Sequence, residues 1–204
     1  MLVAAEASGD LLGAGLMAQL KAQAPQVDWR FVGVGGARMA EHGVKSPFDI
    51  AELSILGLVE GLKAYGRVMR RVRDTAALAA AEKPDAVVLI DSWGFTLRVA
   101  HAIRKAMPGV PLIKYVGPQV WAMRPGRAKT LARSVDLLLA LHPMDAPYFE
   151  REGLATVVVG NPALNADVSH GDPAALREKL GLTKDDQMLL VLPGSRPSEI
   201  KRLM

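Results

Sequence analysis

Short apolar runs alternate with longer amphipathic stretches along most of the chain. Seven runs are short and apolar enough to be buried strands: Leu2–Ala5, Trp29–Val34, Ala86–Ile90, Leu112–Val116, Leu137–Leu141, Val157–Val159 and Met188–Leu192. Six longer stretches have helical patterns: Leu11–Ala24, Leu56–Ala81, Phe95–Met107, Gly126–Arg133, Asp145–Glu152 and Pro173–Leu180. Strands that alternate with helices are typical of βα units. The pattern therefore predicts an α/β fold, with a Rossmann-like parallel sheet flanked by helices.

A polar, strand-breaking stretch at 161–172 interrupts this pattern and indicates a linker. We therefore expect one domain at residues 1–168, followed at 169–204 by linker and the incomplete start of a second domain. The second segment offers one helix, one strand, a Pro-Gly-Ser-Arg loop and the beginning of another helix. Such a unit cannot bury its apolar face alone. We expect the chain to be part of a longer protein whose second domain is truncated here.

The composition narrows the class of protein. Half of the 204 residues are hydrophobic, and there is no cysteine, which excludes a disordered chain, a disulfide scaffold and thiolate metal sites. No apolar run reaches the roughly 18 residues that span a bilayer, and residues 1–10 lack the features of a signal peptide. The four histidines are scattered without metal-ligand spacing. We expect a cytoplasmic protein without a metal or cofactor.

Positive charge is concentrated in one part of the chain. Residues 98–133 carry eight basic side chains and no acidic one, although the net charge of the whole chain is +4. Such a block suits phosphate-bearing ligands or anionic lipid, and a solvated helix surface is the alternative. The chain has ten aromatic residues, and it lacks an RNA-binding motif, a zinc finger and a basic zipper. Nucleic acid is therefore not an expected partner.

The first predicted strand leads into a loop of small residues that contains Glu6, Ser8, Gly9 and Asp10. Free backbone N–H groups at the start of the following helix could hold an anion or a sugar hydroxyl there. The alternative is that Ser8 or Asp10 simply caps that helix. A second glycine loop, at 33–36, does not have the GxGxxG spacing, which disfavours a dinucleotide site.

Asp91 ends a buried apolar strand, so its carboxylate should emerge at the carboxyl edge of the sheet. A general base belongs at such a place, and the alternative is an Asp that only caps the next helix or fixes a loop. Two further loops carry groups suited to a sugar phosphate or a diphosphate. These groups are Gln119, Trp121 and Arg124 in one loop, and Gly194, Ser195 and Arg196 in the other. For the first loop, packing of Trp121 that merely fixes the backbone is the alternative.

The run at 53–62 is apolar and precedes a helix with Lys63, Arg67, Arg70 and Arg71 on one face. An apolar patch beside a basic helix face suits a membrane surface. An amphipathic helix packed on a sheet has the same pattern, and this alternative stays open.

Seven motifs, in this order along the chain, resemble those of one family. They are EASGD at 6–10, GVGG at 33–36 with Met39, ILGLVE at 55–60, VLID at 88–91, YVGPQVWA at 115–122 followed by RPGRAKTLA, VGNP at 159–162 and LPGSRPSEI at 192–200. Together they resemble the lipid A disaccharide synthases. The resemblance covers nearly the whole chain.

The resemblance implies an inverting two-domain GT-B glycosyltransferase that needs no metal. The family transfers 2,3-diacylglucosamine from UDP-2,3-diacylglucosamine to 2,3-diacylglucosamine 1-phosphate, giving the lipid A disaccharide 1-phosphate and UDP. Its members are peripheral on the inner face of the cytoplasmic membrane. UDP-diacylglucosamine, diacylglucosamine 1-phosphate and an anionic membrane surface are the implied partners, and the resemblance leaves a homodimer open. This chain alone is expected to be inactive.

Matched motif by motif, the resemblance makes Asp91 the base that takes the proton of the acceptor's 6-hydroxyl. It makes Arg196 a catalytic residue, an arginine needed for activity at the UDP phosphates, and it places the loop from Glu6 to Asp10 beside the acceptor. The chain departs from the family at Asn161, where a histidine is more common, and at the Trp93-Gly94 pair that follows the strand Asp. We expect the Trp93-Gly94 pair to crowd the Asp91 carboxylate.

Other functions stay open at the level of the sequence. One is another GT-B transferase with a lipid-linked acceptor, such as the one that adds N-acetylglucosamine to the peptidoglycan precursor, although its first loop is richer in glycine and histidine. A second is a non-catalytic α/β module that binds phosphate or an anionic membrane. A third is a nonhydrolysing UDP-sugar epimerase, which would not need the lipid patch.

Overall fold

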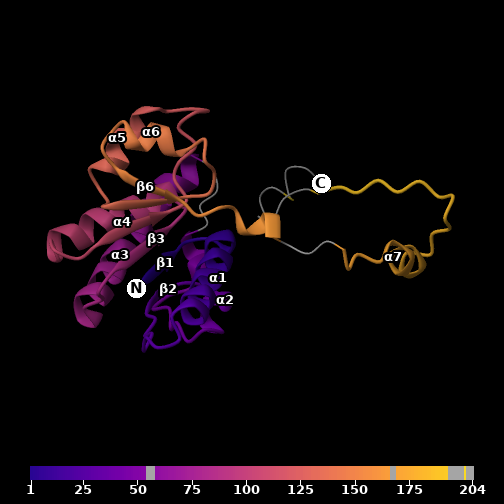
Figure 1. The fold of residues 1–204 in the computed structure, drawn as a ribbon, viewed down its shortest axis with the longest axis horizontal. Coiled ribbons are helices and arrows are strands. Elements are labelled where there is room, and N and C mark those ends of the chain that lie inside the picture. The colour runs from indigo at the N-terminus through magenta and orange to yellow at the C-terminus, as the bar shows by residue number, and fades with distance from the viewer. Residues whose placement is uncertain (54–57, 166–168, 193–199, 201–204) are drawn as a thin grey trace. The chain divides into compact units, whose positions relative to one another are not determined.

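The computed structural model describes residues 1–53, 58–165, 169–192 and 200, with the backbone alone at 58–64 and 165. Within these residues six parallel strands form one sheet, in the order β2-β1-β3-β4-β5-β6 (Figure 1). The strands are β1 (Leu2–Ala4), β2 (Gly33–Val34), β3 (Val87–Ile90), β4 (Leu112–Tyr115), β5 (Leu137–Ala140) and β6 (Ala155–Val158). The predicted parallel α/β sheet is therefore confirmed.

Helices cover both faces of the sheet (Figure 1). They are α1 (Ala7–Gln23), α2 (Ala37–Ala40), α3 (Leu58–Glu82), α4 (Trp93–Ala106), α5 (Gly126–Ala132) and α6 (Ala146–Glu150), with the short 3-10 helix η1 (Ile50–Leu53). One buried cluster joins α1 and α2 to the sheet, and the other joins α3, α4, α5 and α6 to it. The chain thus has the three-layer arrangement that buries a parallel sheet on both sides.

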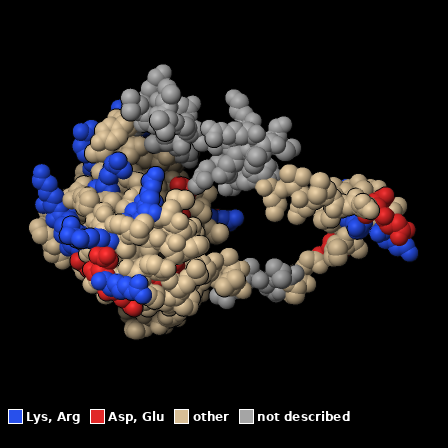
Figure 2. All heavy atoms as spheres, turned by 90° about the horizontal axis from the view of Figure 1, so that it is seen from above, with Lys and Arg blue, Asp and Glu red and all other residues tan. Residues whose placement is uncertain are grey.

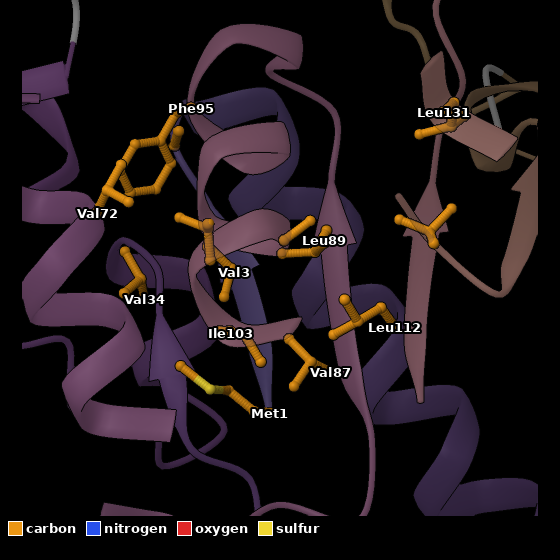
Figure 3. Close-up of a cluster of buried hydrophobic side chains, with 14 of the residues drawn as sticks. Met1, Val3, Val34, Val72, Val87, Leu89, Phe95, Ile103, Leu112 and Leu131 are labelled. Atoms are coloured by element: carbon orange, nitrogen blue, oxygen red, sulfur yellow. The ribbon is translucent and has the colours of Figure 1, made fainter. Parts of the chain in front are cut away.

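Alternation along the strands decides which side chain enters which cluster. Val3, Leu89 and Leu112 point toward the α3–α4 side, where Figure 3 shows them beside Ile103 of α4. Leu2, Ala4, Ile90 and Tyr115 lie in the cluster on the α1 side. This alternation is the two-residue period of a strand. Burial of each large apolar side chain contributes about 1.5–3 kcal/mol, so the two clusters hold the sheet between its helix layers.

Three predicted elements differ from the structure by more than two residues at one end or are absent from it. The first helix begins at Ala7 and not at Leu11. The second strand is reduced to Gly33–Val34, because β2 lies at the edge of the sheet and pairs with β1 alone. Residues 188–192 are not a strand, because no described strand offers them backbone partners, and their side chains are exposed. The predicted helix start at Leu56 lies outside the described residues.

The chain divides into two compact units, Met1–Asn161 and Pro162–Met204. The first unit holds the whole sheet and helices α1 to α6. The second holds η2 (Pro162–Asn165) and α7 (Pro173–Lys179), and the Asp172 carboxylate caps α7 by accepting from the backbone nitrogen of Ala175 at 2.9 Å. The predicted domain boundary after residue 168 stays a prediction.

Candidate active site

The order of the strands creates a switch point between β1 and β3. From β1 the chain crosses to β2 on one side, and it then returns to β3 on the other side of β1. In open parallel sheets, ligands bind in the crevice at the carboxyl ends of the two strands that flank such a point. The turn after β1 and Asp91 after β3 are the segments that lie there.

Most of the predicted site residues share this edge of the sheet. Glu6, Ser8, Gly9 and Asp10 follow β1, Asp91 follows β3, and Gln119, Trp121 and Arg124 follow β4, and these three strands are neighbours. Asn161 follows β6, three strands beyond β3, which places it on the order of 14 Å along the edge at about 4.8 Å per strand. Gly194, Ser195 and Arg196 lie outside the described residues.

Asp91 has an unusual backbone conformation. Its φ is 45° and that of Ser92 is 40°, so two consecutive non-glycine residues are left-handed. Such conformations are uncommon and cluster at functional sites. The backbone nitrogen of Asp91 donates to the Tyr115 carbonyl at 2.9 Å, which joins the turn to β4. The N-cap residue of α4 is Ser92, and its side chain makes no cap hydrogen bond, so the alternative in which Asp91 caps this helix is wrong. The alternative in which Asp91 only fixes a loop stays open.

Lys114 is a buried lysine at the end of β4, 3% exposed, and it adjoins Asp91. Its Nζ donates to the Asp91 carbonyl oxygen and, at 2.8 Å, to Thr96 Oγ1. Burial lowers the pKa of Lys114 from 10.5 to about 7, although the Asp91 carboxylate raises it. Sequence reasoning missed this residue, since it counted Lys114 as one charge of the basic block. Its position two residues after Leu112, on the apolar face of the strand, was the available signal.

Asp10 does not cap its own helix. Ser8, Gly9 and Asp10 lie within the first turn of α1, and the N-cap residue, Glu6, makes no side-chain cap bond. The Asp10 side chain is buried and caps α2, where Oδ1 accepts from the backbone nitrogens of Gly36 at 2.7 Å and Met39 at 3.1 Å. Oδ2 accepts from that of Arg38 at 2.9 Å. The capping alternative is therefore wrong for Asp10, and its carboxylate occupies the start of α2.

A pocket of about 520 Å³ opens beside the start of α1. Its described walls are the start of α1, the turn from Gly36 to Arg38 and the start of η1. The lining includes the acidic residues Glu6, Asp10 and Asp49 and the basic residue Arg38. Acidic side chains therefore predominate over basic ones in this lining.

The η1 wall of the pocket is held by a residue of α3. Arg71 donates to Glu52 of η1, with Nη2 at 2.7 Å from Oε2, and it lies over the Phe48 ring at 4.8 Å. Phe48 in turn packs edge-on against Phe95 of α4, with 6.5 Å between ring centroids. Arg71 therefore fixes the wall of the pocket to the helix layer behind it.

The loop after β4 exposes its aromatic residue. Trp121 is 46% and Met123 65% exposed, while the neighbouring Val120 is buried. Packing of Trp121 therefore does not fix the loop, and that alternative is wrong because Val120 supplies the anchor. Arg127, in the first turn of α5, lies over the Trp93 ring at 5.0 Å. Trp93 also packs against the core, so its ring ties α4 to α5.

The basic block is not one uniform surface. Lys114 is buried, and Arg104 forms an ion pair with Asp136 at 2.6 Å. Arg98, Arg124 and Lys129 are exposed, and Figure 2 shows Lys and Arg side chains over one face of the first unit, with Asp and Glu in smaller groups. A part of the predicted block is thus available to an anionic ligand or surface.

Two properties of the described residues bear on the site. Their histidines and acidic side chains do not gather in any group of three or more that could hold a metal ion. Within the same ranges, no helix combines the length and the apolar character needed to cross a membrane.

Comparison with known proteins gives the family. The family model for lipid-A-disaccharide synthetase matches residues 1–204. The chain is 46% identical over 203 residues to the lipid-A-disaccharide synthase of Paramagnetospirillum magneticum. This match covers 100% of this chain and 52% of that relative. It is 42% identical to the synthases of Myxococcus xanthus, over 204 residues, and Pseudomonas aeruginosa, over 202 residues. These two matches cover 100% and 99% of this chain, and 52% of each relative.

The chain thus spans about half the length of the curated relatives it matches. Along that half the family model includes every residue, among them the turn after β1 and Asp91 at the switch point. The resemblance in the sequence motifs is confirmed, and the chain belongs to the lipid-A-disaccharide synthetase family.

Proposed function

We propose that this chain forms the acceptor side of a GT-B lipid-A-disaccharide synthase. The complete protein would transfer 2,3-diacylglucosamine from UDP-2,3-diacylglucosamine to 2,3-diacylglucosamine 1-phosphate, with UDP as the second product. The observation that carries the proposal is the place of Asp91, in a left-handed turn at the switch point of a sheet whose chain belongs to this family. Left-handed turns of this kind are typical of functional sites.

In the proposed reaction the Asp91 carboxylate accepts the proton of the acceptor's 6-hydroxyl. The oxygen attacks the anomeric carbon of the donor sugar, a new carbon–oxygen bond forms, and the bond from that carbon to the UDP oxygen breaks. Attack from the side opposite UDP inverts the configuration. A base at this position is expected to contribute about 10²–10⁴-fold to the rate. In this proposal Arg196, with Gly194 and Ser195, binds the UDP phosphates; these residues lie outside the described ranges.

The two loops that flank Asp91 suit different parts of the acceptor. The pocket beside α1 carries the carboxylates of Glu6 and Asp49. Carboxylates accept hydrogen bonds from sugar hydroxyls, and their negative charge disfavours a phosphate. Arg124 and Arg127 beyond β4 suit the acceptor's 1-phosphate, because guanidinium groups bind phosphate strongly. We propose that the sugar lies toward the pocket and the phosphate toward the loop after β4.

The acyl chains of both substrates require a membrane or a lipid-covered surface. Trp121 and Met123 are exposed on the loop after β4, and Arg124 follows them directly. Apolar side chains beside basic ones bind the interface of anionic membranes. We propose that this loop contacts the inner face of the cytoplasmic membrane. The predicted ILGLVE patch, at 55–60, lies outside the residues whose side chains are described.

The test is release of UDP from UDP-2,3-diacylglucosamine, measured with and without diacylglucosamine 1-phosphate. The assay compares this chain with its reading frame extended past Met204. Acceptor-dependent release by the extended protein supports the transferase. No release from either form contradicts it and favours a non-catalytic module, and release that depends on a different lipid-linked acceptor favours another transferase.

A further inference from the structure

The ammonium group of Lys114 is buried in the seam between β4, α4 and α5. The side chain is 3% exposed and extends from the apolar face of the sheet. Described residues that line the seam with it are uncharged, among them Leu89, Trp93 and Leu131. A lysine in such a place is costly unless its donors are satisfied. The contacts of its Nζ therefore indicate what the residue does.

Those contacts converge on the turn that carries Asp91. Nζ donates to the main-chain oxygen of Asp91 and to Thr96 Oγ1. The Thr96 hydroxyl lies 2.8 Å from the Asp91 carbonyl and 3.0 Å from the Ser92 carbonyl. Lys114 and Thr96 thus hold both carbonyl groups of the left-handed pair. The backbone cost of that pair is offset by polar contacts that are shielded from water.

We propose that Lys114 is a positioning residue for Asp91: through the Asp91 carbonyl and Thr96 it stabilises the left-handed turn that presents the carboxylate at the sheet edge. The inference rests on the proposed function, in which Asp91 is the base. Burial prevents Lys114 from touching a substrate, so it acts through the turn. A displacement of the base by about 1 Å is enough to cost a large part of the rate.

The electrostatics agree with this geometry. The Asp91 carboxylate raises the pKa of Lys114, against the larger lowering by burial. The other ionisable side chains of α4 and α5 make different contacts or are exposed: Arg98 bonds the Gly94 carbonyl, His101 bonds Ser134, Arg104 pairs with Asp136, Arg127 lies over Trp93, and Lys105 and Lys129 are exposed. Asp91 is therefore the charged group whose loss should change the pKa of Lys114.

The first experiment measures kcat and KM of the complete synthase with Lys114→Met, which keeps the length of the side chain and removes its donors. We expect kcat to fall at least tenfold and KM to change less than threefold, with no loss of thermal stability. Thr96→Val is the second variant, in case Lys114→Met fails to fold, and it should lower kcat in the same way. Lys21→Met, at an exposed lysine in the last turn of α1 and outside the basic block, is the matched control and should change neither constant. Normal kcat in a folded Lys114→Met or Thr96→Val protein overturns the proposal.

The second experiment separates this inference from the proposed function. Nuclear magnetic resonance of lysine labelled with ¹³C at Cε, assigned by the loss of one signal in Lys114→Met, follows the protonation of Lys114 without any activity assay. Asp91→Asn should lower the pKa of Lys114 and Lys21→Met should not, and an unchanged pKa in Asp91→Asn overturns the coupling. If Asp91→Asn keeps full activity while the pKa of Lys114 falls, the base assignment fails and the coupling stands.

Discussion

The Asp10 carboxylate accepts a hydrogen bond from the backbone nitrogen of Gly36 at 2.7 Å, across 26 positions of the chain. The contact joins the first turn of α1 to the start of α2. The fit is close, because a Cβ at Gly36 would lie 2.7 Å from Asp10 Oδ2 and 3.0 Å from Ile50 Cδ1. Asp10, Gly36 and Ile50 also line the pocket beside α1. One buried carboxylate thus shapes the wall of the proposed acceptor site.

Asp10→Ala should destabilise the first unit. It leaves three backbone N–H groups at the start of α2 without their acceptor, and we expect a loss of about 2–4 kcal/mol in the free energy of unfolding. Urea denaturation followed by circular dichroism measures it. Ser8→Ala, an exposed neighbour in the same turn, should change stability by less than about 0.5 kcal/mol. Equal stability of Asp10→Ala and wild type would show that water replaces the carboxylate.

Two glycines should respond to alanine in opposite directions. At Gly36 the new methyl group meets Asp10 and Ile50, and we expect a loss of about 1–3 kcal/mol from overpacking. At Gly66, inside α3, a Cβ would meet nothing within 4 Å, and the higher helix propensity of alanine should add about 0.5–1 kcal/mol. Thermal melts of the two variants check the difference in sign. A stabilised Gly36→Ala would mean that the α2 turn has room to move.

The sequence predicted the parallel sheet and the place of Asp91 because both depend on local patterns. A short apolar run rich in β-branched residues, such as 86–90, is typical of a buried strand in an α/β fold, and the residue that ends it lies at the sheet edge. The prediction of a strand at 188–192 was wrong because a strand needs a pairing partner that lies far away in the sequence. Its apolar pattern was right for a strand, and yet no described strand offers it hydrogen bonds.

The roles of Asp10 and Lys114 depend on tertiary contacts that the sequence does not display. Asp10 has the ordinary position of a helix cap, and the start of α2 that it binds is 26 residues away. Lys114 has the ordinary charge of a surface residue, and its burial follows from the alternation on β4 and the packing of α4 and α5. Patterns of spacing therefore placed the site on the sheet edge, and packing decided which polar groups support it.

Lys114 should make stability depend on pH. Its pKa is about 7 in the folded protein against an ordinary 10.5, so between these values the unfolded chain binds one proton more and stability rises with pH. The slope is at most about 1.4 kcal/mol per pH unit, and below pH 7 the unfavourable contribution of the buried charge is fully present. Lys114→Met removes this dependence. Denaturation of both proteins from pH 6 to pH 10 should show that the free energy of unfolding of the wild type rises relative to that of the variant. If the two free energies changed with pH in parallel, the lowered pKa would be contradicted.

Asp91→Asn should lower kcat of the complete synthase by about 10²–10⁴-fold, because an amide cannot accept the acceptor's proton at neutral pH. KM should change less than threefold, since the amide keeps the size of the side chain. Asp28→Asn, at an exposed carboxylate that precedes β2 and so lies on the side of its amino end, is the control and should keep full activity. Steady-state release of UDP measures all three proteins. A fall of less than tenfold in Asp91→Asn would assign the base to another residue.

The paired change of Trp121 and Met123 to alanine should weaken binding to vesicles that contain anionic lipid. Both side chains are exposed on the loop after β4, and insertion of two such groups is worth about 2–3 kcal/mol at an interface. We therefore expect the vesicle affinity to fall at least tenfold in co-sedimentation.

Val27→Ala, at a similarly exposed apolar residue before β2, is the matched control and should bind as the wild type does. Arg124 adjoins the pair, so the remaining affinity should fall further as salt screens its charge. If Val27→Ala weakens binding as much as the paired change, the loop has no special part in it, and the membrane contact must be sought on another face.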